Sequence, residues 1–309
     1  MQIVVMGSAA GGGFPQWNCN CRNCYSLRQG NFRGPSRTQT QVAVSDDGHC
    51  WFLLGASPDL RVQIESTLAL HPQGCTRHSP IAGVVLLNAD IDHMVGLLSL
   101  RELHQFVIYC TVSLRQILLE DNRIFGILNR VPQQARWMDA KVGEGFPLKT
   151  VSGVETGTSC ELFPIGYKWP AYVPRDRRER LEPDAASLGV TLTSAGQKRL
   201  VFLPTVPSID NDLLQKLEMA DLILFDGTFW SDDELVRVEK GGPSAGEMGH
   251  VSVGGPNGTL SRLRGLLGPQ KVFLHINNTN PMLDPTSPEH KSVLEAGWRI
   301  AEDGWRFEL

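Results

Sequence analysis

Short apolar runs alternate with helix-like patterns along most of the chain. Apolar runs of about 4 to 8 residues bounded by turn residues are typical of buried strands, and they occur at residues 2–6, 84–87, 107–110, 200–203, 221–225 and 271–274. Turn residues between paired runs predict two hairpins, over residues 41–54 and 298–309. Apolar residues at helical spacing predict helices over residues 60–70, 94–104 and 113–119. This pattern by itself predicts an α/β or α+β fold.

Three of the predicted strands lead directly into residues that can catalyse a reaction or bind a metal: Asp92-His93, Asp226 and His275. Polar groups at the carboxyl ends of buried strands are typical of α/β active sites. The three strand ends therefore predict one shared site. Helix capping by Asp90 or Asp92 is the alternative for the first of these segments taken alone.

Three cysteines lie within six residues, at Cys19, Cys21 and Cys24. Three thiolates at this spacing suit one tetrahedral zinc ion, because the intervening backbone can fold around a Zn–S shell of about 2.3 Å. A redox pair of Cys21 and Cys24 is the first alternative, but the expected βαβ context is missing. A reduced, metal-free loop is the second. The other four cysteines are scattered singly, as in proteins of a reducing compartment.

The composition is that of an ordinary soluble protein, with 41% hydrophobic and 20% charged residues. A net charge of −4 gives no reason to expect nucleic acid or an anionic membrane as partner. No apolar run approaches the roughly 20 residues that span a bilayer, and the start MQIVVMG lacks the features of a signal peptide. We therefore expect a cytoplasmic protein without a membrane segment.

Residues 167–189 contain three prolines and the charged run Arg175–Arg180. A charge run usually forms a solvated surface loop. The alternative is a mobile basic lid that receives an acidic substrate, because long irregular loops are often functional.

The segment Asn88 to His93 resembles the HxHxDH motif of the metallo-β-lactamase superfamily, with only Asp92 and His93 matching and with Asn88 and Asp90 in place of the two earlier histidines. The segments SAAGGGFPQWNCNCRNC, ASPDLR, DGTFWSDDEL, GEMGHVSVGG and HINNTNPMLDPTSPEH are similar to the pyrroloquinoline quinone (PQQ) biosynthesis protein B family along nearly the whole chain. The resemblance implies an α+β fold, a four-layer αββα sandwich, in one domain over residues 1–309. It also implies His250 as the fourth ligand of a structural zinc.

Hydrolases of this superfamily hold two metals, and the resemblance implies that one of their two ligand sets is lost here. The remaining set is Asp92, His93 and His275. Two imidazoles and one carboxylate are the ligands of non-haem iron oxygenases, so a two-metal hydrolase is disfavoured. Asp226 is expected nearby, orienting a ligand or water, and Asp90 is expected to coordinate the metal or bind substrate.

The family resemblance implies a role in PQQ biosynthesis, as an iron- and oxygen-dependent hydroxylase of the tyrosine ring in a glutamate–tyrosine precursor. The substrate would be a small peptide-derived or diamino-acid compound. The active site would hold Fe(II), or zinc in the purified protein, because zinc outcompetes iron for such ligands. Alternatives are a soluble carrier that assists transport of PQQ or its precursor to the periplasm, and a metal-dependent hydrolase. The oligomeric state stays open, with a homodimer as one option.

Overall fold

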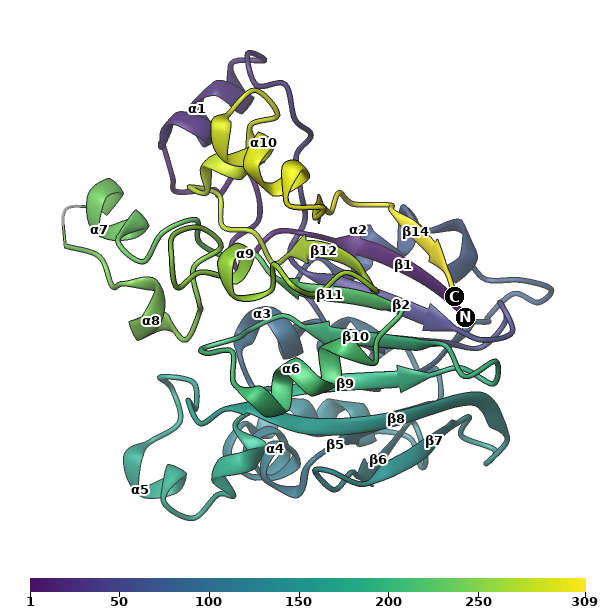
Figure 1. Ribbon diagram of the computed structural model, residues 1–309. Coiled ribbons are helices and arrows are strands. Elements are labelled where there is room, and N and C mark those ends of the chain that lie inside the picture. The colour runs from purple at the N-terminus through teal and green to yellow at the C-terminus, as the bar shows by residue number, and fades with distance from the viewer. Residues whose placement is uncertain (240) are drawn as a thin grey trace. The chain divides into compact units, whose positions relative to one another are not determined.

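The computed structural model describes residues 1–239 and 241–309 (Figure 1). The chain divides into two compact units, each built from separate stretches of sequence. The first unit contains residues 1–6, 41–198 and 304–309, and the second contains residues 7–40 and 199–303. The single domain over residues 1–309 stays a prediction.

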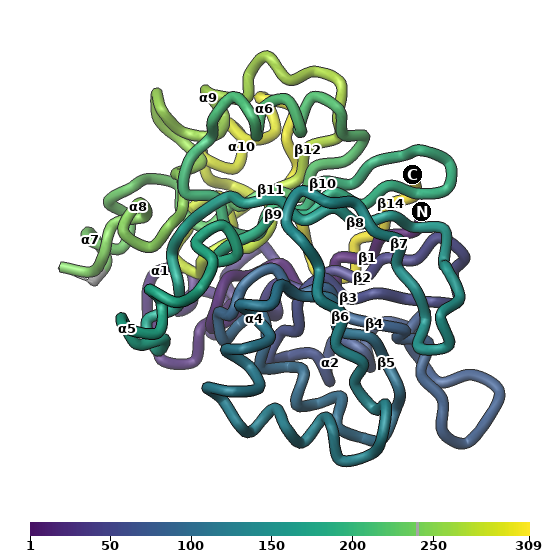
Figure 2. The backbone as a smooth tube through the Cα atoms, turned by 90° about the horizontal axis from the view of Figure 1, so that it is seen from below, coloured from purple at the N-terminus to yellow at the C-terminus, as the bar shows by residue number. Residues whose placement is uncertain are grey.

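The first unit contains a sheet with the strand order β14-β1-β2-β3-β4-β5-β6 (Figure 2). Its strands are β1 (Gln2–Gly7), β2 (Gln41–Ser45), β3 (Trp51–Leu54), β4 (Ile81–Val85), β5 (Phe106–Cys110), β6 (Ala135–Asp139) and β14 (Arg306–Glu308). Strands β3 to β6 run parallel. Strands β2 and β3 form the predicted antiparallel hairpin. Strands β2, β3 and β5 are buried along their whole length, as expected from their continuous apolar runs.

The same unit contains the antiparallel strands β7 (Gly145–Lys149), β8 (Glu155–Gly166) and β9 (Ser187–Thr193). Its α-helices are short: α2 (Leu60–Glu65), α3 (Ile91–Met94), α4 (Val112–Gln116) and α5 (Arg175–Arg178). The helix predicted over residues 94–104 instead begins with α3 and continues as a 3-10 helix, Val95–Leu100. A Cβ added at Gly96 would lie 2.0 Å from the carbonyl oxygen of Ser57. No side chain fits at this position, and Gly96 N donates to Ala56 O at 2.9 Å, which attaches the helix to the neighbouring loop.

The second unit contains the parallel strands β10 (Arg199–Leu203), β11 (Leu222–Asp226), β12 (Gln270–Leu274) and β13 (Arg299–Ile300). Its α-helices are α1 (Arg22–Arg28), α6 (Asn211–Glu218), α7 (Glu234–Glu239), α8 (Ala245–Met248), α9 (Thr259–Arg262) and α10 (Pro288–Glu295). Within the described residues, the strands form two mixed sheets with helices on them, which confirms the α+β class.

The prediction of a C-terminal hairpin over residues 298–309 is wrong. Strand β13 pairs with β12, and β14 pairs with β1. Trp298 stacks on Phe273, with ring centroids 4.2 Å apart, so burial of the indole directs β13 to β12. Asp303 and Gly304 do form a turn, but the carboxylate of Asp303 accepts hydrogen bonds from Ser8 and Thr38, so the turn is bonded to other parts of the chain.

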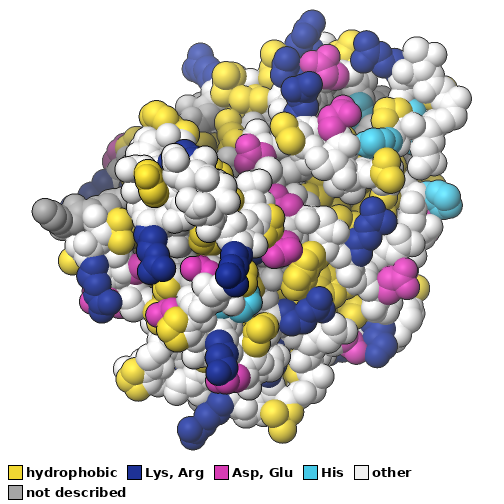
Figure 3. All heavy atoms as spheres, turned by 90° about the horizontal axis from the view of Figure 1, so that it is seen from above, with side chains coloured by type: hydrophobic (Ala, Val, Ile, Leu, Met, Phe, Trp, Pro, Cys, Tyr) yellow, Lys and Arg dark blue, Asp and Glu magenta, His cyan; other side chains and the backbone are white. Residues whose placement is uncertain are grey.

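Every helix within residues 1–239 and 241–309 is too short or too polar to cross a bilayer. On the face shown in Figure 3, the side chains of Lys and Arg are interspersed with those of Asp and Glu.

Candidate metal centres

Asp226 and His275 lie at the same edge of the parallel strands in the second unit. Asp226 ends β11 and pairs in register with Leu274, the last residue of β12, and His275 follows directly. The structure thus brings together the residues of two predicted strand ends. It adds His250, which the sequence had not placed here. Metal-ligating atoms of all three side chains lie within 4.8 Å of one another, and all three residues are buried.

The carboxylate of Asp226 accepts four hydrogen bonds. Its Oδ1 accepts from the backbone N and the Oγ1 of Thr228, at 2.9 and 2.6 Å. Its Oδ2 accepts from Val206 N at 2.8 Å and from Nδ1 of His250 at 2.7 Å. Burial by itself would raise the pKa of Asp226, but His250, His275 and the hydrogen bond from Thr228 together hold that pKa below its ordinary value. The group is therefore an ionised carboxylate that orients its neighbours.

Thr228 fixes the tautomer of His275. Its hydroxyl lies 2.6 Å from Asp226 Oδ1 and 2.8 Å from His275 Nδ1. A hydroxyl has one proton, which Asp226 accepts, so Nδ1–H of His275 donates to the hydroxyl oxygen. The Nε2 atom of His275 then carries the lone pair of the neutral ring. A histidine that binds a metal through one ring nitrogen usually donates the N–H of the other ring nitrogen to an oxygen atom nearby.

His250 is held in the same way, by Asp226 directly. Its Nδ1 donates to Oδ2 of Asp226, so its Nε2 carries the lone pair of the neutral ring. The rings of His250 and His275 stack at 5.5 Å with an interplanar angle of 21°. The second unit thus presents two oriented imidazoles side by side.

Asp92 and His93 lie together in the first unit, in helix α3. The carbonyl oxygen of His93 accepts from Ala56 N at 2.7 Å, and the backbone N of His93 donates to Asp90 O at 2.9 Å. His93 is buried and Asp92 is half-buried, and Nε2 of His93 lies 3.6 Å from Oδ2 of Asp92. Two ligand atoms that each lie about 2.1 Å from one ion are separated by about 3.0 to 3.4 Å, so this pair fits a shared metal with a small adjustment.

The alternative of helix capping by Asp90 is wrong, because the Asp90 side chain makes no capping hydrogen bond to α3. Asp90 precedes the helix in extended conformation, and its backbone N donates to Oδ1 of Asn88 at 3.0 Å. Asp92 and His93 belong to the first unit and His275 to the second. The ligand set Asp92, His93 and His275 therefore draws on both units and stays a prediction.

The three neighbouring cysteines form a second cluster in the second unit. The sulfur atoms of Cys19, Cys21 and Cys24 lie within 4.8 Å of one another. Cys21 caps helix α1, and its sulfur accepts from Cys24 N at 3.5 Å. Burial raises the pKa of the Cys24 thiol to about 12. A buried sulfur of this kind needs a nearby cation to become a thiolate, which a bound zinc would supply.

The prediction that His250 completes this cysteine cluster is not supported by its position. His250 is not among the residues within 4.8 Å of the three sulfurs, because it bonds Asp226 and stacks on His275. Gly249, with φ 89°, ends α8 in the left-handed conformation and directs the next residue towards β11. The carboxamide of Asn278 contacts the cysteines instead, with Nδ2 at 3.1, 3.6 and 3.4 Å from the sulfurs of Cys19, Cys21 and Cys24.

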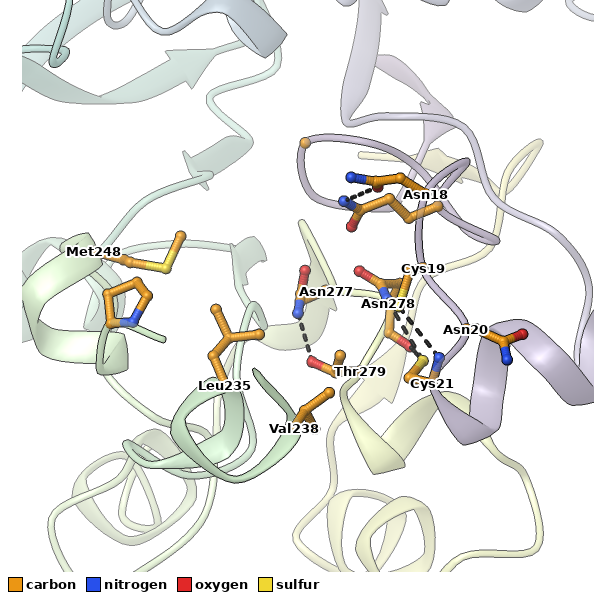
Figure 4. Close-up of a pocket in the computed structure, with 13 residues that line it drawn as sticks. Asn18, Cys19, Asn20, Cys21, Leu235, Val238, Met248, Asn277, Asn278 and Thr279 are labelled. Atoms are coloured by element: carbon orange, nitrogen blue, oxygen red, sulfur yellow. Dashed lines mark hydrogen bonds between the residues drawn. The ribbon is translucent and has the colours of Figure 1, made fainter. Parts of the chain in front are cut away.

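A cavity of about 600 Å³ adjoins the cysteine cluster within the second unit (Figure 4). Its polar wall consists of side chains without charge from the cysteine loop and from the segment after His275: Gln16, Asn18, Cys19, Asn20, Cys21, Asn277, Asn278 and Thr279. Its apolar wall comes from residues near α7 and α8: Leu235, Val238, Pro243 and Met248. The cavity therefore offers hydrogen-bonding groups on one side and a hydrophobic surface on the other.

Glu234 is a buried acid behind this cavity. Thr279 Oγ1 donates to its Oε1, and Trp230 N donates to its Oε2 at 2.7 Å. Burial raises the pKa of Glu234 to about 7 in spite of these hydrogen bonds. The folded protein therefore binds this proton more tightly than the unfolded chain does.

We predict that Glu234→Gln flattens the pH dependence of unfolding. In the folded state the pKa of Glu234 is raised from 4.5 to about 7. The contribution of Glu234 to the free energy of unfolding of the wild type therefore falls as the pH rises between these values and is constant above them. The loss is on the order of 2 to 3 kcal/mol. Urea unfolding of both proteins at pH 5 and pH 8 measures it. Parallel pH dependences of the two proteins would contradict the assignment.

The predicted basic lid over residues 167–189 is bonded to the first unit at several points. Arg177 Nε lies 2.8 Å from Asp121 Oδ2, and Glu182 N donates to the hydroxyl of Ser113 at 3.0 Å, whereas Arg178 donates to carbonyl oxygens within the segment itself. The hydroxyl of Tyr172 donates to Ala89 O, next to Asp90. These contacts engage part of the positive charge, and a mobile lid for an acidic substrate stays a prediction.

The comparisons with known proteins agree with this geometry. A family model described as "Beta-lactamase superfamily domain" matches residues 50–276. A "Coenzyme PQQ synthesis protein B" from Ruegeria pomeroyi is 41% identical over 309 residues and covers 100% of both chains. Its namesake from Gluconobacter oxydans is 42% identical over 311 residues, covering 100% of this chain and 99% of that one.

The similar solved structures share the fold. The crystal structure of Zn²⁺-bound PqqB from Methylobacterium extorquens has a TM-score of 0.90 at 37% identity, covering 100% of both chains. A diphosphatase from the PhnP family has a TM-score of 0.67 at 19% identity, covering 100% of this chain and 96% of that one, which indicates the fold alone. These matches confirm the predicted metallo-β-lactamase fold, a four-layer αββα sandwich.

Proposed function

The chain belongs to the family of coenzyme PQQ synthesis protein B, and from this premise we propose that it hydroxylates the tyrosine ring of a glutamate–tyrosine precursor in PQQ biosynthesis. The reaction uses Fe(II), dioxygen and a two-electron reductant: one oxygen atom enters the ring and the other leaves as water. Asp92, His93 and His275 would hold the metal, which would activate dioxygen when bound. The zinc named for the relative from Methylobacterium extorquens is compatible with these ligands, because zinc competes with iron for the same donors.

The observation that carries the proposal is the set of hydrogen bonds that orients the His275 ring. Asp226, Thr228 and His275 form a buried hydrogen-bonded series that leaves the lone pair of the ring on Nε2. A histidine fixed in this tautomer is prepared to bind a metal. Asp226 already accepts four hydrogen bonds, so it supports the ligand instead of bridging two metals.

The bound metal supplies the redox chemistry, and the protein supplies position and proton transfer. His250 lies beside His275, with Nδ1 on the Asp226 carboxylate. This arrangement allows Nε2 of His250 to accept the proton that leaves the tyrosine ring when the new C–O bond forms. Burial of Asp226, His250 and His275 limits the access of bulk water to these groups.

We predict that Thr228→Val weakens metal binding at His275 by about 10- to 100-fold. Valine has nearly the shape of threonine, but it can neither accept from Nδ1 of His275 nor donate to Asp226. Metal titration of the variant, with zinc kept at the cysteines, measures the effect. Thr228→Ser keeps the hydroxyl and serves as the control. Equal affinities of the valine variant and the wild type would show that the hydroxyl does not support the ligand.

Oxygen consumption separates this proposal from the alternatives. With a two-electron reductant supplied, the Fe(II)-loaded protein should consume O₂ beyond the background of the reductant only when a tyrosine-containing precursor is present, and the Zn-loaded protein should not. A soluble carrier would bind the precursor without oxygen uptake. A metal-dependent hydrolase would convert a substrate equally well with zinc and without oxygen. Either of these results would overturn the hydroxylase proposal.

A further inference from the structure

Glu234, the buried acid at the start of helix α7, connects the two loops that carry Asp226 and His275. Its Oε1 accepts a hydrogen bond from Thr279 Oγ1, and its Oε2 accepts one from the backbone N of Trp230 at 2.7 Å. Trp230 lies four residues after Asp226, and Thr279 lies four residues after His275. All these residues belong to the second unit. One carboxylate therefore joins the loop after β11 to the loop after β12, at the same distance along the chain from each strand end.

The loop after β12 holds His275 in an unusual backbone conformation. His275 has φ 56°, in the left-handed region that a residue with a Cβ rarely adopts. Such a conformation persists only where the surrounding contacts determine it. The position of the His275 ring therefore depends on how firmly the next residues of the loop are held.

Two hydrogen bonds attach this loop directly to the loop after β11. The backbone N of Asn277 donates to Thr228 O at 3.1 Å, and Nδ2 of Asn280 donates to Gly227 O at 3.0 Å. Glu234 adds an attachment of a different kind, because it reaches the loop from helix α7. It also bonds the loop after β11, so it fixes both loops to the same helix.

The hydroxyl of Thr279 transmits the attachment from Glu234 to the loop. It accepts from Nδ2 of Asn277 at 2.6 Å and donates to Glu234, so its one proton and one of its lone pairs are used. Figure 4 shows Asn277 and Thr279 joined by this hydrogen bond, next to Leu235 of α7. Asn277 lies two residues after His275, so the series of hydrogen bonds runs from α7 back towards the ring.

The burial of Glu234 agrees with a role other than stability. The residue is 7% exposed, and burial raises its pKa to about 7. A buried ionisable group stabilises a fold no better than a well-packed apolar side chain of similar volume. Acids with strongly shifted pKa values concentrate at functional sites. The two donors of Glu234 lie on the loops that carry Asp226 and His275, which indicates that the acid determines how these loops are placed.

We propose that Glu234 is a positioning residue of the metal site, which holds His275 in the conformation from which its ring binds the metal. Glu234 acts through Thr279 and not through contact with the metal. Without the carboxylate, the hydroxyl of Thr279 loses its acceptor, and the loop after β12 relaxes from the left-handed conformation at His275. This inference rests on the proposed role of His275 as a metal ligand.

Metal titration of Glu234 variants tests the proposal. We expect Glu234→Ala to lower the affinity for the metal at His275 by about 10-fold, and to leave the metal at the cysteines unchanged. Glu234→Gln keeps an acceptor for Trp230 N and a polar group beside Thr279, so its affinity should stay within about 3-fold of the wild type. Equal affinities of Glu234→Ala and the wild type would overturn the proposal.

Asp233→Ala is the matched control for these variants. It removes the neighbouring carboxylate, which accepts hydrogen bonds from Ser231 and Arg237 and not from the loop after β12. Both metals should bind as in the wild type. A loss at His275 as large as that of Glu234→Ala would show a general effect of charge or stability, which would contradict positioning by Glu234.

A double-mutant cycle tests whether Glu234 acts through Thr279. Thr279→Val nearly keeps the shape of the side chain and removes the hydroxyl. If the two residues act as one unit, the double variant Glu234→Ala/Thr279→Val should bind the metal at His275 no more weakly than the weaker of the two single variants. Losses that add up would show that the two residues act separately, and would overturn the proposal.

The proton NMR signal of His275 Nδ1–H gives a readout that needs no metal at His275. This N–H donates to Thr228 in the wild type, so a shifted or broadened signal reports a displaced ring. We expect that change in Glu234→Ala and not in Glu234→Gln. An unchanged signal in Glu234→Ala would overturn the inference. A wild type that binds metal only at the cysteines would refute the proposed function at His275, while a displaced ring in Glu234→Ala would still show that Glu234 positions it.

Discussion

Replacing His275 with alanine should remove one metal equivalent per chain and reduce hydroxylation to background. His275 is the ligand whose tautomer the structure explains, through Thr228 and Asp226. Without its imidazole, Asp92 and His93 offer only two ligands, which is too few for tight binding of a divalent metal. Zinc at the cysteines should remain, because Cys19, Cys21 and Cys24 are untouched. Metal analysis after anaerobic loading with Fe(II) measures both sites in one experiment.

His78→Ala is the control for this variant, because His78 is exposed on the first unit. It should keep both metals and full activity. A His275→Ala protein that retains two metals per chain would show that His275 is not a ligand. If it lost both metals, the cysteine zinc would depend on His275, which would contradict two separate metal sites.

Replacing Cys21 with serine should release the structural zinc and lower the melting temperature by about 10 °C or more. Cys21 contributes a sulfur to the cluster and caps helix α1. The cluster joins residues 19–24 to Asn278, more than two hundred positions later in the chain. Loss of zinc therefore affects the stability of the second unit and not only activity. Zinc content and thermal unfolding of the purified variant measure the two effects.

Cys75→Ser is the matched control, because Cys75 is an exposed single cysteine of the first unit. It should leave zinc content and melting temperature unchanged. An unchanged zinc content in Cys21→Ser would contradict the structural zinc, and a lost zinc with an unchanged melting temperature would contradict its stabilising role.

The strand ends of the second unit could be predicted from the sequence because its buried strands are continuous apolar runs that stop where the strands stop. Apolar runs at residues 221–225 and 271–274 gave β11 and β12 to within one residue. Parallel strands present their carboxyl ends at one edge, so Asp226 and His275 had to lie close together once the strands paired. A prediction of this kind uses only local patterns and the geometry of a sheet.

His250 and Asn278 could not be placed in this way, because each meets its partners through loops. The ring of His250 depends on the left-handed Gly249 and on Asp226, and no periodic pattern joins these residues. Asn278 lies in a polar loop whose partners are more than two hundred residues away. Thr228 left a weak signal, since an Asp carboxylate often accepts from the backbone N–H two residues on, as Asp226 does here, which brings the Thr228 hydroxyl close.

The C-terminal residues were mispredicted because contacts distant in the sequence determine their packing. The turn residues Asp303-Gly304 predicted a hairpin, but Trp298 packs on Phe273 and Asp303 bonds Ser8 and Thr38. The turn forms, but burial of an indole and a carboxylate with three donors direct the two flanking strands to other partners. Patterns among neighbouring residues do not predict such long-range contacts.

Isotope labelling tests the central proposal most directly. The Fe(II)-loaded protein is allowed one turnover with a tyrosine-containing precursor and a two-electron reductant under ¹⁸O₂ in ordinary water, and the mass of the product is measured by mass spectrometry. An O₂-dependent hydroxylase whose metal is held by Asp92, His93 and His275 should place one ¹⁸O atom on the tyrosine ring. A product that carries oxygen only from water, or a precursor recovered unchanged, would contradict the account.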